Sequence, residues 1–378
     1  RIVRRIEMKV GILAAKTGHG HINVGKALQS AFEKRSIEAE LFSSFYEDLM
    51  QSNKIISDYY NFLMMTSPQL CYKFSELSYI TRPDLSEDFY SGVEDKLKNF
   101  LRQSSFDVII STSHTINFAL IRARKELNLQ KKIKFYIVVT DPYIPISVGF
   151  DVKGADHYFC ATDNVKSYLM KNIDLERISV VPFPIQQKFF KEYEKDEITK
   201  IYKRLKLRKR KKIVLINSGS QGSFHSTEFL KAVLQNFPEL QVIFVCGKNE
   251  SLYQLAKLII GENKDRVCIC KYVDNMNDIL KIADFVVTKA GANSFFECVS
   301  MKKPILVDSL QGFLYQEKGV ANLLKEHQIG IIVDSIEHFI EAVATLNDEN
   351  CYQQYVQNLE KMDSANGADE IVEQILHA

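Results

Sequence analysis

Short apolar runs and longer mixed segments alternate along almost the whole chain. In the first half, runs rich in valine, isoleucine and phenylalanine have the length of buried strands. They lie at residues 9–15, 37–42, 107–111, 133–139, 157–160 and 178–181. The segments between them have helical spacing, and the longest extends from about residue 43 to residue 103. This alternation predicts a parallel sheet that is covered by helices and connected by right-handed crossovers.

The same pattern begins again in the second half of the chain. Further strands are predicted at residues 212–217, 240–246, 266–270, 284–287, 304–307 and 330–333. Each half opens with a strand, a glycine-containing turn and a helix, which is how a doubly wound domain starts. The sequence therefore predicts an α/β protein with two Rossmann-like domains. We place them at residues 1–190 and 212–350, with a linker at 191–211 and further helices at 351–378.

Composition and charge narrow the class of protein. The apolar share of 46% and the charged share of 25% are those of a globular protein, and the net charge of +2 argues against a dedicated nucleic-acid binder. The seven cysteines are scattered and odd in number, so we interpret them as reduced thiols in the cytoplasm. No apolar run approaches the 18 residues of a membrane span. Residues 1–7 lack the apolar core of a signal peptide, and Met8 is a candidate natural start.

Eight of the ten residues from 203 to 212 are basic. A solvated linker explains this run, and attraction to an anionic membrane surface is the functional alternative.

Polar side chains follow two consecutive strands of the second half. Asn293 is expected to cap a helix on which Glu297 follows, and Gln316 and Glu317 open the next helix. Carboxylates and amides held side by side can bind the vicinal hydroxyls of a sugar. The alternative is that the acidic residues only complement the dipoles of their helices.

Two residues of the first half are candidates for acid–base chemistry. His21 is expected at the start of the first helix, and an imidazole can take a proton from a hydroxyl group near neutral pH. A lone histidine in such a turn more often has no catalytic role. Asp141 directly follows the strand at 133–139, where it could orient the base or the acceptor.

Several of these residues together match a known family. The series Lys289-Ala290-Gly291, Glu297, Lys303-Pro304-Ile305, Gln316-Glu317-Lys318 and Asn322 resembles the donor-sugar motif of the GT-B glycosyltransferases. The chain is most similar to the diacylglycerol glycosyltransferases and the plant galactolipid synthase, which belong to glycosyltransferase family 28. More distantly, it resembles the N-acetylglucosaminyltransferase of peptidoglycan synthesis. The resemblance implies two Rossmann-like domains that face a cleft, a tail at 351–378 that crosses back to the first domain, and a UDP-sugar donor.

The resemblance also implies roles for individual residues. The segment Gly18-His19-Gly20-His21 matches the family pattern Gly-x-Gly-His. The resemblance therefore implies that His21 is the catalytic base and that Asp141 is the partner of His21. His19 is the second candidate for the base. The loop 218–223 would hold the diphosphate, although it has fewer glycines than the family's usual version. The donor-binding residues expected in this way are Gly20, Gly219, Ser220, Gln221, Gly247, Tyr272, Val273, Met276, Gly291, Ala292, Asn293, Glu297, Gln316, Glu317 and Asn322.

The acceptor side rests on an aromatic region at residues 55–80. A core-facing pair of helices explains it, but its apolar positions are too many for one stripe, so a surplus face could contact lipid. Relatives use the matching region for membrane contact. Where relatives continue the Thr140-Asp141 pair with histidine and tryptophan, this chain has Pro142 and Tyr143. The expected acceptor or membrane residues are Tyr59, Tyr60, Phe62, Met64, Met65 and Tyr143.

We therefore expect an inverting glycosyltransferase that moves a hexose from a UDP-sugar to diacylglycerol or a related membrane lipid. The alternatives are a soluble or polyprenyl-linked acceptor, a UDP-sugar epimerase, and a sensor that binds UDP-sugar without catalysis. The chain has no Asp-x-Asp pair, so we expect neither a metal nor another cofactor. We expect a cytoplasmic protein that can bind the inner face of the cell membrane and has no nucleic-acid partner.

Overall fold

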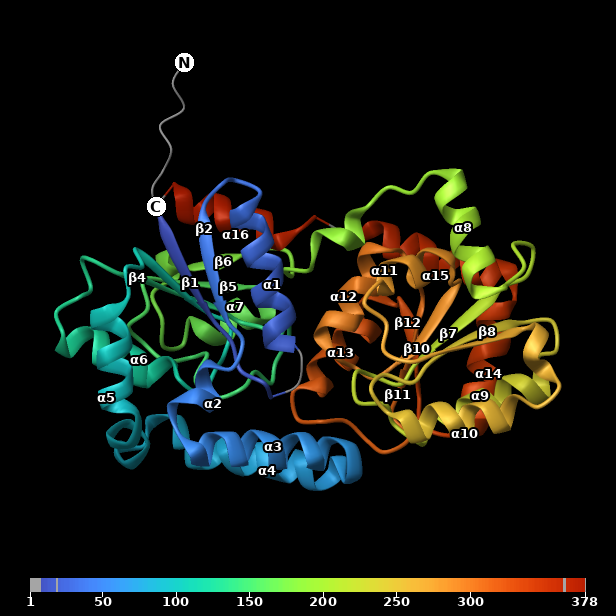
Figure 1. The fold of residues 1–378 in the computed structure, drawn as a ribbon, viewed down its shortest axis with the longest axis horizontal. Coiled ribbons are helices and arrows are strands. Elements are labelled where there is room, and N and C mark those ends of the chain that lie inside the picture. The colour runs from blue at the N-terminus through green and yellow to red at the C-terminus, as the bar shows by residue number, and fades with distance from the viewer. Residues whose placement is uncertain (1–7, 18–19, 363–364, 378) are drawn as a thin grey trace, which may run out of the picture. The chain divides into compact units, whose positions relative to one another are not determined.

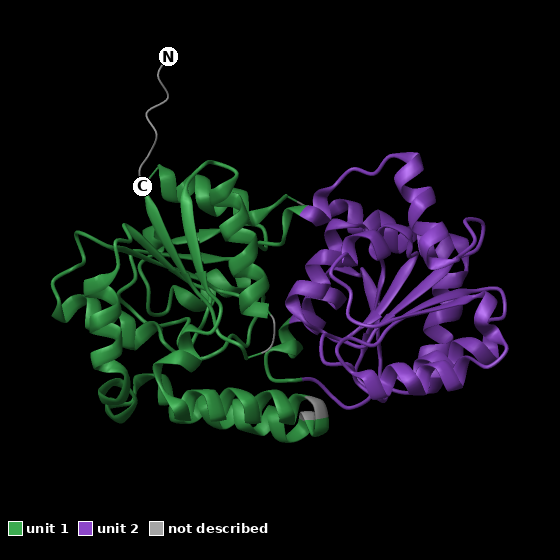
Figure 2. Ribbon diagram, in the orientation of Figure 1, with its two compact units in different colours: residues 1–187, 314–319, 365–378 green, residues 188–313, 320–364 purple. Residues whose placement is uncertain are grey.

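The computed structural model describes residues 8–17, 20–362 and 365–377 and contains two compact units (Figures 1 and 2). Unit 1 comprises residues 1–187, 314–319 and 365–378, and unit 2 comprises residues 188–313 and 320–364. Residues 1–7, Gly18 and His19 lie outside the described part, as does the side chain of Met65. Each unit is a parallel sheet with helices around it.

Unit 1 contains a six-stranded sheet in the order β2-β1-β3-β4-β5-β6. Its strands are β1 (Lys9–Leu13), β2 (Glu38–Phe42), β3 (Val108–Ser111), β4 (Lys134–Val138), β5 (His157–Cys160) and β6 (Ile178–Val180). Its helices are α1 (Gly20–Glu33), α2 (Phe45–Leu49), α3 (Gln51–Thr66), α4 (Pro68–Thr81), η1 (Pro83–Leu85), α5 (Glu87–Gln103), α6 (Asn117–Glu126), α7 (Asp163–Leu169), η2 (Leu175–Arg177) and α16 (Gly367–Leu376). All pairings in this sheet are parallel, so the loops after β1, β3 and β4 lie at one edge.

Unit 2 repeats this plan with the strand order β12-β11-β10-β7-β8-β9, again all parallel. Its strands are β7 (Ile213–Asn217), β8 (Gln241–Val245), β9 (Val267–Cys270), β10 (Phe285–Thr288), β11 (Ile305–Asp308) and β12 (Gly330–Val333). Its helices are α8 (Lys195–Leu205), α9 (Ser226–Asn236), α10 (Glu250–Ile260), η4 (Asn263–Asp265), α11 (Met276–Ile282), α12 (Ala292–Ser300), α14 (Ile336–Asn347) and α15 (Glu349–Lys361). Two further helices cross the boundary between the units, namely η3 (Gln187–Phe190) and α13 (Glu317–His327).

Helices bury both faces of the first sheet, which explains why its strands are apolar without alternation. Ile109 and Ile137 pack into one cluster with Leu97 of α5 and Leu120 of α6. The opposite face is covered by α1. There, a Cβ atom added to Gly25 would lie 2.7 Å from Leu41 and 3.5 Å from Ile12, so the absent side chain allows close packing.

The last helix, α16, packs beside α1 within unit 1 (Figure 1). Asp369 of α16 forms ion pairs with Arg35 at 2.8 Å and with Lys34 at 3.3 Å. Gly367 lies directly against the backbone of Pro182, because a Cβ atom added to Gly367 would be 1.5 Å from the carbonyl oxygen of Pro182. The end of the chain is therefore an integral part of unit 1.

The predicted fold class is confirmed, and each of the twelve predicted strands appears within one or two residues of its expected bounds among the described residues. One local prediction is wrong. Gly291, rather than Asn293, is the cap residue of α12, and Asn293 lies inside the helix. The helix begins at Ala292, earlier than expected, because Gly291 is the last residue with extended backbone (φ −81°, ψ 132°) before it.

Candidate active site

The carboxyl ends of β1, β3 and β4 bring the acid–base candidates of unit 1 together. His21 is the second residue of α1, directly after the turn that follows β1. Thr112 follows β3, and Thr140 and Asp141 follow β4. Because these three strands are neighbours in a parallel sheet, their ends meet at one edge, which is where open α/β sheets bind ligands.

The hydrogen bonds of His21 fix which ring nitrogen carries the proton. Its Nδ1 lies 2.7 Å from the carbonyl oxygen of Thr112 and 3.1 Å from the hydroxyl oxygen of Thr140. A carbonyl oxygen can only accept, so Nδ1 donates its hydrogen there. In the neutral ring Nε2 then holds the lone pair, and it has no hydrogen-bond partner among the described residues. Burial lowers the pKa of His21, against the opposing charges of Asp141 and Glu47. The ring is therefore set up to accept a proton at Nε2.

Asp141 is buried beside His21, with 7% of its surface exposed. Its Oδ2 accepts a hydrogen bond of 2.7 Å from the backbone N–H of Ser147. Burial raises the pKa of Asp141, while the bonds from Ser147 and the charge of His21 lower it. A carboxylate in this position can stabilise the imidazolium that forms when His21 takes up a proton.

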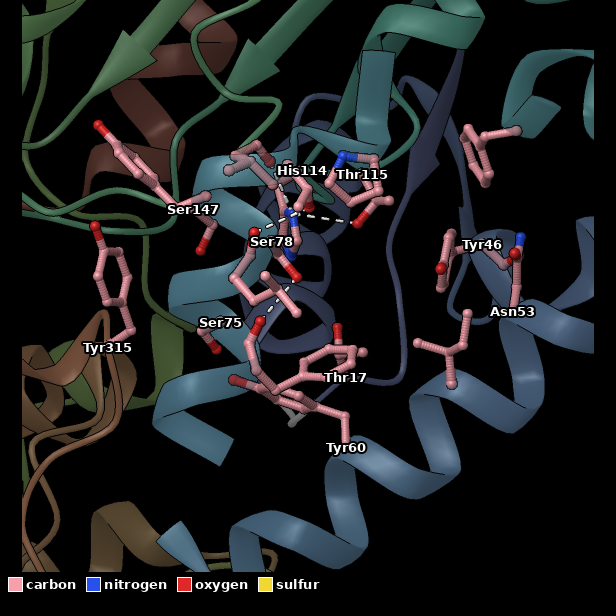
Figure 3. A pocket seen from close by; sticks show the side chains of 18 of the residues that line it. Thr17, Tyr46, Asn53, Tyr60, Ser75, Ser78, His114, Thr115, Ser147 and Tyr315 are labelled. Atoms are coloured by element: carbon pink, nitrogen blue, oxygen red, sulfur yellow. Dashed lines mark hydrogen bonds between the residues drawn. The ribbon is translucent and has the colours of Figure 1, made fainter. Parts of the chain in front are cut away.

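A cavity of about 470 Å³ in unit 1 opens beside these residues (Figure 3). His21, Asp141 and Thr17 line one part of it. The remaining wall is mainly apolar, and most of it comes from the segment between α2 and α5. It includes Met50, Ile56, Tyr60, Phe74, Leu77, Tyr79, Pro83 and Phe89. A small polar region that carries a base thus continues into a larger apolar space, as in a site for an apolar molecule with a hydroxyl group.

The helices α3 and α4 form a hairpin (Figure 1), and several of its large apolar side chains are exposed to solvent. Its exposed members are Ile55, Ile56, Tyr59, Phe62, Leu70, Phe74, Leu77 and Ile80, of which Ile80 is 74% exposed. Such a concentration of apolar surface is typical of a binding face. Tyr60 and Met64 instead pack with Leu63, Cys71 and Leu314. None of the described helices is long and apolar enough to cross a membrane.

The segment 314–319, which follows β11, packs against this hairpin as part of unit 1. Tyr315 packs against Tyr72 and Tyr79 in tilted arrangements, with ring centroids 5.7 and 5.6 Å apart. The amide of Gln316 donates to the hydroxyl of Tyr60 at 3.3 Å, and Gln316 lines the cavity that His21 also lines. Oε2 of Glu317 accepts from the backbone N–H of Leu314 at 2.9 Å.

Some of the donor residues expected in unit 2 lie on loops at the carboxyl ends of its strands. Gly222 (φ 75°) and Gly247 (φ 61°) adopt left-handed backbone that favours glycine. A Cβ atom on Gly247 would be 2.4 Å from the carbonyl oxygen of Gly219, so the loops after β7 and β8 touch. The backbone N–H of Lys248 also donates to the carbonyl oxygen of Ser220 at 2.9 Å. This contact joins the loop 218–223, to which the family resemblance assigns the diphosphate, to the loop that carries the expected donor residue Gly247.

Glu297 lies on α12, after β10, where burial disfavours the charged form of its carboxyl group. Burial raises its pKa to about 8, while the charge of Lys188 lowers it. Such a carboxyl group can donate a hydrogen bond as well as accept one near neutral pH. Among the other expected donor residues, Tyr272 and Asn322 are exposed, Tyr272 to 47%. The ammonium group of Lys248 lies over the ring of Tyr272.

The structure thus gathers part of the expected set in one cavity. His21, Asp141, Tyr60 and Gln316 line it, whereas Tyr59 and Phe62 are exposed on the hairpin and Tyr143 is half-buried. The remaining donor residues in unit 2 follow its strands or lie on its helices. They are Gly219, Ser220 and Gln221 after β7, Gly247 after β8, Tyr272, Val273 and Met276 after β9, Gly291, Ala292, Asn293 and Glu297 after β10, and Asn322 on α13.

Sequence reasoning missed three features of these sites. His114, after β3, lines the cavity with its ring centroid 5.6 Å from that of His21. Tyr315 lines the same cavity. In unit 2, Nε2 of His225 contacts Asp308 and its Nδ1 lies 2.6 Å from the hydroxyl oxygen of Ser223, which braces the loop 218–223. A position at or shortly after the end of a strand was the available signal for Asp308 and His114.

No group of three or more histidine, cysteine, aspartate or glutamate side chains in the described part of the chain could hold a metal ion.

Two families match the sequence in tandem. Residues 21–185 match the monogalactosyldiacylglycerol (MGDG) synthase family, and residues 213–375 match the glycosyltransferase family 28 C-terminal domain. A processive diacylglycerol beta-glucosyltransferase of Bacillus cereus (strain AH187) is 27% identical over 393 residues, which cover 97% of this chain and 93% of that protein. The protein of the same name from Bacillus thuringiensis (strain Al Hakam) matches with the same identity and coverage.

Solved structures share the fold at low sequence identity. The S. aureus protein MnaA, solved with UDP, has a TM-score of 0.62 and 18% identity, with 98% of this chain and 96% of that chain covered. MurG of Acinetobacter baumannii has a TM-score of 0.66 and 13% identity, with 98% and 100% covered. The predicted relationship and enzyme class are thereby confirmed. The chain has two Rossmann-like domains in the GT-B fold, and its two halves match glycosyltransferase families, with similarity to the diacylglycerol glucosyltransferases and MGDG synthases.

Proposed function

We propose that the protein is an inverting glycosyltransferase that transfers a hexose from a UDP-sugar to a lipid hydroxyl, with diacylglycerol or a related membrane lipid as acceptor. We assign activation of the acceptor to unit 1 and binding of the nucleotide to unit 2. The names of the relatives support this acceptor class, because they are diacylglycerol glucosyltransferases and MGDG synthases.

In the proposed reaction, Nε2 of His21 takes the proton of the acceptor hydroxyl. The acceptor oxygen attacks the anomeric carbon, a new C–O bond forms, and the bond from that carbon to the diphosphate oxygen breaks with inversion. Its electron pair leaves with UDP. The imidazolium that results is stabilised by Asp141 and by the bond from Nδ1 to the carbonyl oxygen of Thr112. General-base catalysis of this type contributes about 10²–10⁴-fold.

The donor is assigned to the loops after the strands of unit 2. The positive end of the dipole of α9, which begins shortly after the loop 218–223, can stabilise the charge of the leaving diphosphate. Glu297 would bind the ribose hydroxyls, and Gln316 and Glu317 would bind the sugar. Gln316 lines the same cavity as His21, so a sugar bound there would lie beside the base. In this proposal neither a metal nor another cofactor takes part, and EDTA should leave turnover unchanged.

A lipid acceptor accounts for two features that a soluble acceptor leaves unexplained. The apolar wall of the cavity can take the first carbons of acyl chains, and the exposed face of α3 and α4 can enter the surface of a bilayer. We therefore place the working enzyme on the cytoplasmic face of the cell membrane.

The observation that carries the proposal is that Nε2 of His21, at an apolar cavity, has no hydrogen-bond partner in the part of the chain that the structure describes. To test it, UDP-glucose, UDP-galactose and UDP-N-acetylglucosamine are incubated with and without diacylglycerol in mixed micelles, and free UDP is measured. Release of UDP that requires lipid supports transfer. Conversion of one UDP-sugar into another in the absence of an acceptor would indicate an epimerase. The absence of free UDP with every lipid would contradict the proposal.

A further inference from the structure

A second imidazole lies beside His21 in the cavity of unit 1, and the reaction described above does not use it. His114 follows β3, the neighbour of β1 in the sheet, and it lines the same cavity together with Thr115 (Figure 3). The two ring centroids are 5.6 Å apart, with 49° between the ring planes. Phe150, which is fully buried, packs against both rings with centroids at 6.5 and 5.8 Å.

The hydrogen bonds of His114 repeat those of His21. Its Nδ1 lies 2.9 Å from the carbonyl oxygen of Val148, which can only accept, so Nδ1 carries the hydrogen and Nε2 the lone pair. Burial and the neighbouring His21 lower the pKa of His114 to about 3. The ring therefore stays neutral at physiological pH, and its Nε2 can only accept a hydrogen bond. That atom has no partner among the described residues, although the side chain is partly exposed at the cavity.

The backbone around His114 is held rigidly. Gly149 (φ 91°) lies so close that an added Cβ would be 2.1 Å from the carbonyl oxygen of His114. The buried amide of Asn117 donates to the carbonyl oxygen of Gly149 at 3.0 Å. A ring that is fixed on both sides and presents one lone pair to a cavity is a preorganised acceptor for a hydroxyl hydrogen.

We propose that His114 determines acceptor specificity by binding a second hydroxyl group of the acceptor, next to the hydroxyl that His21 deprotonates. The inference rests on the proposed transferase function and narrows its acceptor to related lipids with two hydroxyls, because diacylglycerol itself carries only one. With their centroids 5.6 Å apart, the two rings lie close enough to contact neighbouring hydroxyls of one acceptor molecule. An ester oxygen cannot take this place, because it has no hydrogen to donate. The preferred acceptor is thus a lipid whose head group carries two adjacent hydroxyls, such as a glyceryl or sugar head group.

A matched pair of acceptors tests the proposal. In mixed micelles with the preferred UDP-sugar, kcat/KM is compared for 1-oleoylglycerol, which has two adjacent hydroxyls, and for its 2-O-methyl ether, which keeps only the terminal one. We expect the wild type to prefer the diol about tenfold, as one hydrogen bond to a neutral group can provide. The preference should disappear in His114→Asn, since the asparagine amide can still donate to Val148 but has no acceptor at the place of Nε2.

Two further variants separate binding from folding. His114→Gln, whose side-chain oxygen can reach the place of Nε2, should recover part of the preference. His157→Asn, at a partly buried histidine that contacts Ser179 at 2.8 Å, should keep it in full. Two results would overturn this inference without contradicting the transferase function. In one, UDP release requires lipid but kcat/KM is the same for 1-oleoylglycerol and its methyl ether. In the other, the preference for the diol survives in His114→Asn. Absence of UDP with every lipid would instead contradict the transferase function.

Discussion

His21 and Thr112 are joined by two hydrogen bonds that run in opposite directions. Nδ1 of His21 donates to the carbonyl oxygen of Thr112 at 2.7 Å, and the hydroxyl of Thr112 donates to the carbonyl oxygen of His21 at 3.0 Å. The same hydroxyl lies 3.2 Å from the carbonyl oxygen of Leu13, the last residue of β1. One threonine thus fixes the tautomer of the ring, the start of α1 and the end of β1.

Replacing His21 by alanine should lower kcat by about 10²–10⁴-fold, because the acceptor hydroxyl then loses its base. The measurement is UDP release at saturating lipid, and circular dichroism shows whether the fold is intact. Thr112→Val, which keeps the backbone carbonyl but removes the hydroxyl, should give a smaller loss. Nearly full turnover in folded His21→Ala would exclude the assigned role.

The activity should depend on the protonation of His21. Burial lowers its pKa below the ordinary 6.5, so kcat/KM should rise with pH to a midpoint below 6.5 and stay level at neutral pH. The groups that face the ring are Asp141, Glu47 and the neutral His114. Because the charge of Glu47 raises the pKa of His21, Glu47→Gln should move the acid limb to lower pH.

Glu47 also holds local structure, so its variant needs a control. Its Oε1 accepts from the backbone N–H of Lys16 at 2.9 Å and from the hydroxyl of Ser57 at 2.7 Å. Ser57→Ala removes one of these bonds but keeps the charge, and it should lower stability without a shift of the acid limb. An equal shift in both variants would show that the effect is structural.

The hairpin α3–α4 should bind membranes through its exposed apolar side chains. Leu77 and Ile80 are 58% and 74% exposed, and we expect Leu77→Gln/Ile80→Gln to weaken binding to anionic vesicles about tenfold or more in a flotation assay. Leu258→Gln is the matched control, because Leu258 is 78% exposed on α10 of unit 2. Equal losses in the control and in the hairpin variant would indicate unspecific adsorption.

Glu297 should make stability depend on pH. Its folded-state pKa of about 8 lies above its ordinary 4.5, so its contribution to stability is complete below pH 4.5 and is lost as the pH rises through about 8. Glu297→Gln stays neutral, so without donor it should melt about 3 °C or more above the wild type at pH 9 and near it at pH 4.5. Exposed Glu341→Gln should follow the wild type at both pH values. Parallel melting curves for Glu297→Gln would contradict the assignment.

A buried ion pair at the end of α4 should be important for folding. Arg82 donates to Asp84 and Asp151 at 2.8 to 3.0 Å, and Asp84 is fully buried. Asp84→Ala leaves the guanidinium with one partner fewer and should lower the free energy of unfolding by about 3 kcal/mol in urea. Asp174→Ala breaks only an exposed pair with Arg177 and should cost less than about 1 kcal/mol. A similar small loss in both variants would contradict this role.

The strands were predictable because each is an apolar run with helical segments on both sides. The same logic placed His21 and Asp141 shortly after two strands, and the structure brings the ends of these strands to one edge of the sheet. His114 obeys that rule too, but it lies in no motif, and only the strand order shows that β3 is the neighbour of β1. The contact of Gln316 with Tyr60 joins residues 256 positions apart, so no local pattern could indicate it. The cap of α12 was misplaced because asparagine is the more common capping residue, whereas the backbone of Gly291 ends the loop.

The path of the chain limits how this enzyme can be dissected. Residues 314–319 and 365–378 belong to unit 1, although the sequence on both sides of 314–319 belongs to unit 2. A single cut near residue 187 would therefore yield an N-terminal fragment without Tyr315, Gln316 and α16, and a C-terminal fragment that carries them without their packing partners. Expression of separate halves, domain exchange with a relative and circular permutation should all keep these two returning segments with the first sheet.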